Sequence, residues 1–191
     1  MEKTEKNSTL KCSMYVAISL DGFIAKPDGN IDWLTEDVSQ AELENDDDYK
    51  NFLASVDALV MGGKTYRQVL TFGDWPYSDK KCVVVSRTEP ASNLSDVSFA
   101  SGPPEKNVET PQNEGCWHIW IMGGGEIHSL FLRAGLIDEM RIFVMPKILG
   151  EGIPLFAPPL EGSSAKTCWK LLSHKEWRSN IVELHYRRVD R

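Results

Sequence analysis

Two segments of the chain run from a hydrophobic, strand-like stretch through glycines into a helix-like stretch. They are Ala58–Tyr66, with Gly62 and Gly63, and Ile119–Ile127, with three consecutive glycines. Glycine lets an anionic group approach the backbone closely, and the unpaired N–H groups at a helix start attract negative charge. Two such turns side by side at the carboxyl edge of one sheet could hold the pyrophosphate of a dinucleotide. Each is also explained as a simple tight strand-to-helix turn.

The first segment also fits the spacing of a phosphate loop, because Ala58 is followed at the right interval by Gly63–Thr65. In a true phosphate loop the four intervening residues bend around the phosphates. Here Leu59–Met61 are strand-forming apolar residues, and no strand ends in an Asp that would hold magnesium. The sequence therefore disfavours an ATPase or a kinase.

The spacing of cysteine and histidine argues against a disulfide framework or a metal centre. The four cysteines are spread through the chain without a CxxC pair, and of the four histidines only His118 lies close to a cysteine, Cys116. Three cysteines sit in apolar, strand-like segments, which is typical of buried thiols that behave as small hydrophobes. We predict no metal site.

The net charge of −7 comes from 28 acidic residues against 21 basic ones. Such a chain offers no broad cationic face to a nucleic acid or an anionic membrane. Its apolar runs are too short to cross a bilayer, and its N-terminus lacks the apolar core of a signal peptide. We expect a soluble, cytoplasmic protein. The excess charge is local, because residues 36–48 hold seven acids and no Lys or Arg.

Hydrophobic periodicity predicts strands that alternate with helices. Strands are expected at 11–20, 58–61, 82–86, 97–100, 116–122 and 139–145, helices at 39–55, 64–70 and 126–134, and a closing antiparallel strand pair at 167–173 and 180–188. Residues 101–115 have little apolar content and are expected to form a long surface loop. This order predicts an α/β fold with a mostly parallel sheet and an antiparallel C-terminal edge, in a single domain over residues 11–191 after a tail of residues 1–10.

The chain resembles the dihydrofolate reductase-like superfamily in the order and spacing of motifs at residues 14–25, 29–33, 60–66, 83–87 and 121–126. Residues 135–139 and 145–156 look like the reductase domain of the bifunctional riboflavin-biosynthesis enzyme, the RibD C-terminal domain, rather than dihydrofolate reductase proper. The resemblance spans about residues 10–188. It implies a dihydrofolate reductase-like, three-layer α/β/α fold.

The resemblance also implies an NADPH site. Ala17 and Ile24 would flank the nicotinamide ring, and Ser86 would lie beside the adenosine ribose. Arg87 would favour NADPH over NADH through a charge-assisted contact with the 2′-phosphate, or it is a solvated loop arginine. The cofactor phosphates would meet the two helix starts, at Gly62, Lys64, Thr65, Met122, Gly123, Gly124, Gly125 and Glu126.

Dihydrofolate reductases carry a single catalytic carboxylate on the helix that follows a position resembling Trp33. In this chain that helix holds three consecutive aspartates, of which Asp48 is the first candidate because it lies one turn before Phe52. The second candidate is Asp46. Trp33, Phe52 and Tyr49 would wall the substrate. A solvated acidic face and an ordinary aromatic core are the alternatives.

Two further features depart from the superfamily. Gly63 stands where the superfamily usually has Arg, so one phosphate-binding cation is missing, and the expected loop at 101–115 replaces a helix near the adenosine. We expect an NADPH-dependent reductase that transfers hydride to a pterin- or ribosylaminopyrimidine-like heterocycle. The alternative is a catalytically weak nucleotide-binding sensor or partner module of the same fold. Members are often dimers, but the residues leave open whether this chain is a homodimer.

Overall fold

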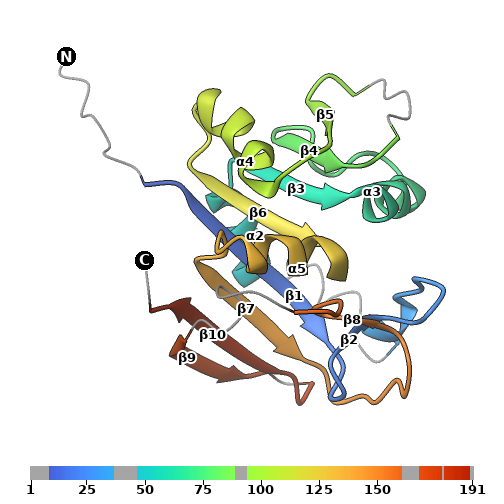
Figure 1. The fold of residues 1–191 in the computed structure, drawn as a ribbon. Coiled ribbons are helices and arrows are strands. Elements are labelled where there is room, and N and C mark those ends of the chain that lie inside the picture. The colour runs from blue at the N-terminus through green and yellow to red at the C-terminus, as the bar shows by residue number, and fades with distance from the viewer. Residues whose placement is uncertain (1–8, 37–46, 89–93, 161–167, 178, 190–191) are drawn as a thin grey trace.

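The computed structural model describes residues 9–36, 47–88, 94–160, 168–177 and 179–189. Its main sheet has eight strands, which are β1 (Lys11–Ile18), β3 (Ala58–Gly62), β4 (Lys81–Val85), β5 (Val97–Ala100), β6 (His118–Gly123), β7 (Glu139–Val144), β9 (Trp169–Glu176) and β10 (Val182–Arg188). Their order is β5-β4-β3-β6-β1-β7-β10-β9 (Figure 1). Strand β10 is antiparallel to both of its neighbours, and the other neighbouring pairs are parallel. The predicted mostly parallel sheet with an antiparallel C-terminal edge is confirmed.

Helices cover both faces of this sheet (Figure 1). On one face lie α2 (Asp47–Ser55) and α3 (Gly63–Val69), and on the other lie α4 (Pro104–Asn113) and α5 (Gly125–Arg133). Strand β3 shows how the alternation of side chains builds the layers, because Val60 joins the core that contains Phe131 of α5 while Leu59 and Met61 join the core that contains Phe52 of α2. The result is the expected three-layer α/β/α arrangement.

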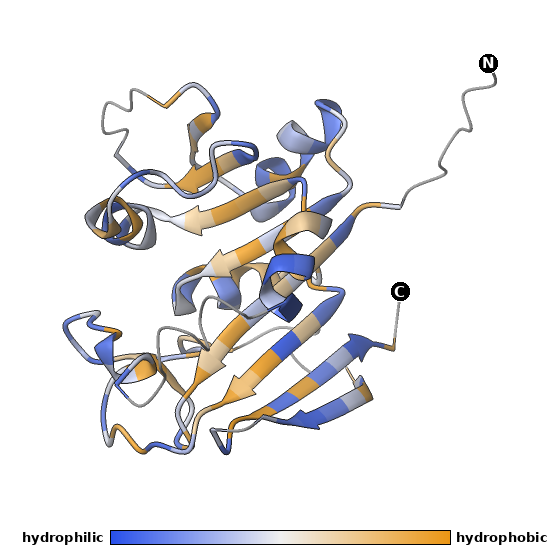
Figure 2. Cartoon of the chain, turned by 180° about the vertical axis from the view of Figure 1, so that it is seen from behind, coloured by the Kyte–Doolittle hydropathy of each residue, from blue (hydrophilic) through white to orange (hydrophobic). Residues whose placement is uncertain are grey.

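Hydropathy differs between the centre of the sheet and its antiparallel edge. Figure 2 shows hydrophobic central strands and a more hydrophilic pair, β9 and β10. Central parallel strands are buried on both faces and read as continuous apolar runs, whereas an edge pair exposes one face to water. In the part of the chain that the structure describes, no helix is both long and apolar enough to cross a membrane.

The prediction of a surface loop at residues 101–115 is wrong, because this segment contains α4. Pro104 stands in the first turn of α4, where its fixed φ favours the helix and its missing N–H costs no hydrogen bond. Asn107, Val108 and Pro111 form a buried stripe on the sheet side. The stripe is short, so the average polarity of the segment concealed it. The expected loss of a helix near the adenosine is wrong for the same reason.

A small second sheet joins the loop after β1 to a distant segment. It pairs β2 (Phe23–Ala25) with β8 (Ile153–Pro154). Asp21 fastens the same two segments, because its carboxylate accepts the N–H groups of Leu149 (3.1 Å) and Gly150 (2.7 Å) as well as the hydroxyl of Ser19 (2.6 Å). The Ser19 hydroxyl and these amides lower the pKa of Asp21 below its ordinary value. The loop that carries Ile24 is thus held against residues 149–154.

Candidate functional site

The two glycine turns lie side by side at the carboxyl edge of the sheet. Strands β3 and β6 are parallel neighbours, and Met61 pairs with Gly123 across them. A Cβ atom added to Gly62 would lie 3.8 Å from the carbonyl oxygen of Gly123. The starts of α3 and α5 therefore open beside each other, which is the arrangement that the sequence predicts for a dinucleotide pyrophosphate.

Gly124 is the point where two predicted cofactor residues, Ile24 and Thr65, converge. A Cβ at this position would lie 3.7 Å from Cδ1 of Ile24 and 3.8 Å from Oγ1 of Thr65. The φ of Gly124 is −76°, which any residue can adopt, so the backbone itself does not require glycine. Three separate segments, the loop after β1, the first turn of α3 and the start of α5, meet here around a half-exposed glycine.

The neighbouring glycines, Gly123 and Gly125, are packed against the interior of the protein. Gly123 has a φ of 119°, and a Cβ there would lie 2.9 Å from the ring of His128. A Cβ on Gly125 would overlap the carbonyl oxygen of Pro154 in β8. The peptide bond between Gly123 and Gly124 is cis. The turn is thus packed between α5 and the small sheet, with only Gly124 facing the open side.

His128 supports this turn from the interior. Its ring is completely buried, and its Nδ1 lies 3.2 Å from the carbonyl oxygen of Leu155. Burial lowers the pKa of His128 to about 4, against the pull of nearby backbone carbonyls. The ring is therefore neutral at physiological pH. Its full burial and its contact with Gly123 are not visible from sequence spacing.

The remaining predicted cofactor residues lie along the same edge. Ser86 directly follows β4, and its Oγ accepts the N–H of Thr88 at 3.3 Å. Ala17 lies near the end of β1 and is half-buried, as is Met122 in β6. The charged members of the predicted set are exposed, and they are Lys64, Arg87 and Glu126.

One row of residues crosses the sheet from Ala17 toward the predicted acid. Ala17 pairs with Phe143, and Phe143 pairs with Glu183. Glu183 in turn pairs with Lys175, whose Nζ lies 2.5 Å from a carboxylate oxygen of Asp48. Asp48, at the start of α2, is thus tied to the same level of the sheet as Ala17. Among the other aspartates, Asp47 is exposed, and Asp46 lies outside the described residues.

The predicted aromatic residues separate into two groups. Phe52 is buried and stacks on Tyr15, with ring centroids 4.5 Å apart, and Tyr49 lies 5.8 Å from the same ring. Tyr15 also contacts Phe143 at 4.6 Å. Trp33, in contrast, is only 1% exposed and is enclosed in the interior. Sequence reasoning missed Tyr15, although its place two residues before Ala17 puts both on one face of β1.

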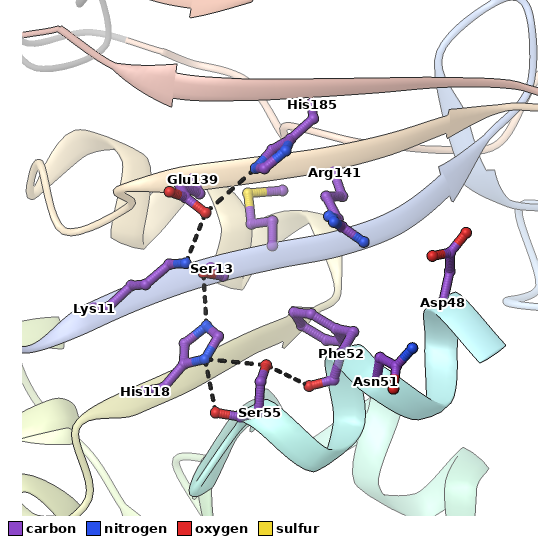
Figure 3. Close-up of a pocket in the computed structure, with 11 residues that line it drawn as sticks. Lys11, Ser13, Asp48, Asn51, Phe52, Ser55, His118, Glu139, Arg141 and His185 are labelled. Atoms are coloured by element: carbon purple, nitrogen blue, oxygen red, sulfur yellow. Dashed lines mark hydrogen bonds and ion pairs between the residues drawn. The ribbon is translucent and has the colours of Figure 1, made fainter. Parts of the chain in front are cut away.

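A cavity of about 250 Å³ lies between α2 and the sheet (Figure 3). Asp48, Asn51, Phe52 and Ser55 line it from the helix. The strands contribute a largely polar wall from Lys11, Ser13, Met14, His118, Glu139, Arg141 and His185. Several of these residues begin their strands, so the cavity extends from Asp48 away from the glycine edge, with the ring of Tyr15 between Ser13 and Ala17 along β1.

Glu139 is the electrostatic centre of the polar wall. Burial raises its pKa, but Lys11 at 2.7 Å, together with Arg187 and His185, outweighs burial and holds the pKa at about 2. Across the cavity His118 places Nε2 2.9 Å from Oγ of Ser13 and Nδ1 2.9 Å from the carbonyl oxygen of Ser55. These contacts satisfy Glu139 and both ring nitrogens of His118 within the protein.

The residues at the glycine edge fit a dinucleotide. Gly124 leaves room on the open side, flanked by an apolar group from Ile24 and a hydroxyl from Thr65. Exposed cations lie at the start of α3, at Lys64, and just after β4, at Arg87. This set would hold phosphates and an apolar ring face. Close backbone, hydroxyl and cationic groups are what such a ligand requires.

Comparison with known protein families agrees with this geometry. Residues 11–182 match the family model of the RibD C-terminal domain. YwjB, an uncharacterized protein of Bacillus subtilis (strain 168), is 37% identical over 181 residues, which cover 94% of this chain and 98% of that protein. The riboflavin biosynthesis protein RibD of Corynebacterium ammoniagenes is 27% identical, and the match covers 78% of this chain and 48% of that protein.

Solved structures show the same fold. A crystal structure from Shewanella sp. PV-4, of a protein provisionally assigned to riboflavin biosynthesis, has a TM-score of 0.77 and 31% identity, covering 94% of this chain and 99% of that one. The diaminohydroxyphosphoribosylaminopyrimidine deaminase/5-amino-6-(5-phosphoribosylamino)uracil reductase of Thermotoga maritima has a TM-score of 0.71 and 17% identity, and covers 95% of this chain and 57% of that one.

Proposed function

The chain belongs to the RibD C-terminal domain family, and from that premise we propose that it is an NADPH-dependent reductase. Its substrate would be a pterin- or ribosylaminopyrimidine-like heterocycle. The relatives named above connect the family with riboflavin biosynthesis and, in one case, with a pyrimidine reductase. The matched part of the RibD protein is about half of its length, so only a reductase role is carried over.

The observation that carries the proposal is the convergence of Ile24, Thr65 and Gly124 at the edge where the two glycine turns meet. When bound, NADPH would supply the hydride, and the protein's part is alignment and exclusion of water. Ala17 and Ile24 would flank the nicotinamide. The backbone around Gly62 and Gly124 would meet the pyrophosphate.

The substrate would lie on the α2 face of the sheet, close to Ala17. Tyr49 and Phe52, joined by Tyr15 and Phe143, offer aromatic surface there. The carboxylate of Asp48 lies at the same level of the sheet and would accept hydrogen bonds from the ring nitrogens of a heterocycle, in exchange with Lys175. Trp33 takes no direct part in this proposal, because it is enclosed.

The proposal is tested first by titrating the protein with NADPH and NADH, using quenching of its tryptophans. Saturable binding of NADPH is expected, and failure of both cofactors to bind would reject the proposal. Oxidation of bound NADPH is then followed at roughly 340 nm, the band of the reduced nicotinamide, with a panel of pterins, ribosylaminopyrimidines and flavins.

One observation favours a second candidate, a nucleotide-binding sensor that has lost efficient catalysis. The carboxylate of Asp48 is already engaged by Lys175 at 2.5 Å. Tight NADPH binding without turnover of any compound in the panel would favour the sensor. Turnover with one heterocycle would favour the reductase and name its substrate class.

A further inference from the structure

Gly63 is a glycine that the backbone does not require. It is the first residue of α3, and its φ lies outside the left-handed region that favours glycine. The reason for glycine at this position must therefore be sought in the space around it.

That space is occupied by the side chains of two other residues. A Cβ on Gly63 would lie 3.1 Å from Oγ of Ser86 and 3.4 Å from Nη1 of Arg67. Arg67 stands one helical turn after Gly63, so its guanidinium reaches back along α3 toward the end of β4. Absence of a side chain at position 63 lets the guanidinium and the hydroxyl approach the same point.

The guanidinium of Arg67 brings a positive charge close to the Ser86 hydroxyl. Arg67 is exposed, and within the described residues no carboxylate forms an ion pair with it. The Oγ of Ser86 accepts the N–H of Thr88 and lies 3.5 Å from the Thr88 hydroxyl, a contact in which either oxygen can donate. When Thr88 donates, the Ser86 hydroxyl can turn its proton toward a ligand. A guanidinium beside a hydroxyl donor matches the oxygens of a phosphate monoester, which arginine binds with two parallel hydrogen bonds.

We propose that Arg67, reaching across Gly63 to Ser86, is a residue that selects a cofactor carrying a 2′-phosphate. The inference rests on the proposed function, because it assumes that the adenosine end of a dinucleotide lies beside Ser86. It assigns to Gly63 the role of making room for the guanidinium. The cation missing at position 63 is thus supplied from one helical turn further along α3.

The test compares wild-type protein with Arg67→Gln, by calorimetric titration with NADPH, NADH, 2′-AMP and 5′-AMP. The Kd for NADPH is expected to rise roughly 10- to 100-fold, as for loss of a charged hydrogen-bond donor, and the Kd for NADH to stay within about twofold. The variant Lys170→Gln is the matched control. It removes one exposed positive charge from β9, at the opposite edge of the sheet, and should change neither Kd.

A second variant tests the role of the glycine while leaving the charge in place. Gly63→Ala adds a methyl group at the point shared by Arg67 and Ser86, and should weaken NADPH and 2′-AMP but not NADH or 5′-AMP. Unchanged Kd values for all four ligands in Arg67→Gln, or equal losses for NADPH and NADH, would overturn the inference and leave the reductase proposal standing. Failure of the wild-type protein to bind either dinucleotide would reject both.

Discussion

The carboxylate of Asp48 on α2 lies 2.5 Å from the ammonium group of Lys175 on β9, the outermost strand of the sheet. The ammonium also lies 3.5 Å from the ring centroid of Trp177. Both partners of the ion pair are partly exposed, so the pair itself contributes at most about 1 kcal/mol to stability. The pair shows that the candidate acid lies at the level of Ala17 on the sheet.

Replacing Asp48 with Asn removes the carboxylate, whereas replacing Lys175 with Gln removes only its partner. If Asp48 handles the substrate, Asp48→Asn should lower kcat on the order of 100-fold with the Kd for NADPH unchanged. Lys175→Gln should retain most of the activity, because the carboxylate remains. Steady-state kinetics and cofactor titration of both variants provide the measurement. Equal losses of kcat in the two variants would show that activity depends on the ion pair, and not on a contact of the Asp48 carboxylate with the substrate.

Gly124 and Gly125 are adjacent, and alanine should affect a different property at each position, cofactor binding at Gly124 and stability at Gly125. A methyl group on Gly124 would contact Ile24 and Thr65 at ordinary distances, whereas one on Gly125 would overlap the carbonyl oxygen of Pro154. Gly125→Ala should therefore cost about 1–3 kcal/mol of unfolding free energy, measured by urea denaturation. Gly124→Ala should keep its stability but bind NADPH more weakly. A lower unfolding free energy in Gly124→Ala, with an unchanged Kd for NADPH, would contradict the assignment of this glycine to the cofactor site.

Arg87 is the second cation near Ser86 and is exposed. If its guanidinium contributes to the 2′-phosphate site, Arg87→Ala should raise the Kd for NADPH roughly tenfold and change the Kd for NADH little. Tryptophan quenching with each cofactor gives both values. An equal loss for the two cofactors would remove the 2′-phosphate assignment, and no loss would return Arg87 to the solvated loop.

The buried ring of His128 predicts a loss of stability in mild acid. Its pKa is about 4 in the folded protein and about 6.5 in the unfolded chain. Between these values the unfolded chain binds the extra proton, so stability is complete above pH 6.5 and falls by up to about 3 kcal/mol as the pH drops to 4. Urea denaturation at a series of pH values gives the unfolding free energy as a function of pH. This free energy should fall less steeply with decreasing pH in His128→Phe than in the wild-type protein. The control His174→Asn, at an exposed position of β9, should keep the wild-type dependence of unfolding free energy on pH. If His128→Phe and the wild-type protein lose unfolding free energy equally as the pH falls, the His128 ring is not the source of the acid sensitivity.

The cysteines should divide into one accessible thiol and three protected ones. Cys168 is exposed, whereas Cys12, Cys82 and Cys116 are buried. Burial raises the pKa of Cys82 to about 12 and also raises that of Cys116, which suppresses the reactive thiolate. Titration of the native protein with a thiol-specific disulfide reagent should therefore give one fast equivalent, and unfolding in guanidinium should release the other three. Two or more fast equivalents would contradict this division.

The sequence was sufficient to predict the parts of the fold that depend on local patterns. The apolar run before Gly62 and the run before Gly123 each predict a strand, and the glycines predict the turn into a helix. The prediction failed for α4, because the buried stripe of Asn107, Val108 and Pro111 is too short and too polar to appear in the periodicity. Local averages conceal a helix that buries only a narrow face.

The candidate site was predicted less completely, because its contacts join distant parts of the chain. Asp48 and Lys175 are 127 residues apart, and only the strand order brings them together. The position of Arg67 depends on how a long side chain folds back over a glycine, which no spacing rule records. The resemblance places Trp33 in the substrate wall, and sequence spacing alone does not show that this side chain is only 1% exposed.

The strand order has a consequence for how the chain reaches its native state. Strand β1 is the first strand in the sequence, but its partners in the sheet are residues 118–120 of β6 and 139–144 of β7. During synthesis more than half of the chain must therefore be made before β1 can pair with a neighbouring strand on either side. Such non-local pairing predicts slow folding and a period in which an unpaired central strand is open to aggregation. A ribosome-bound chain that ends before residue 118 should not yet hold β1 in the sheet.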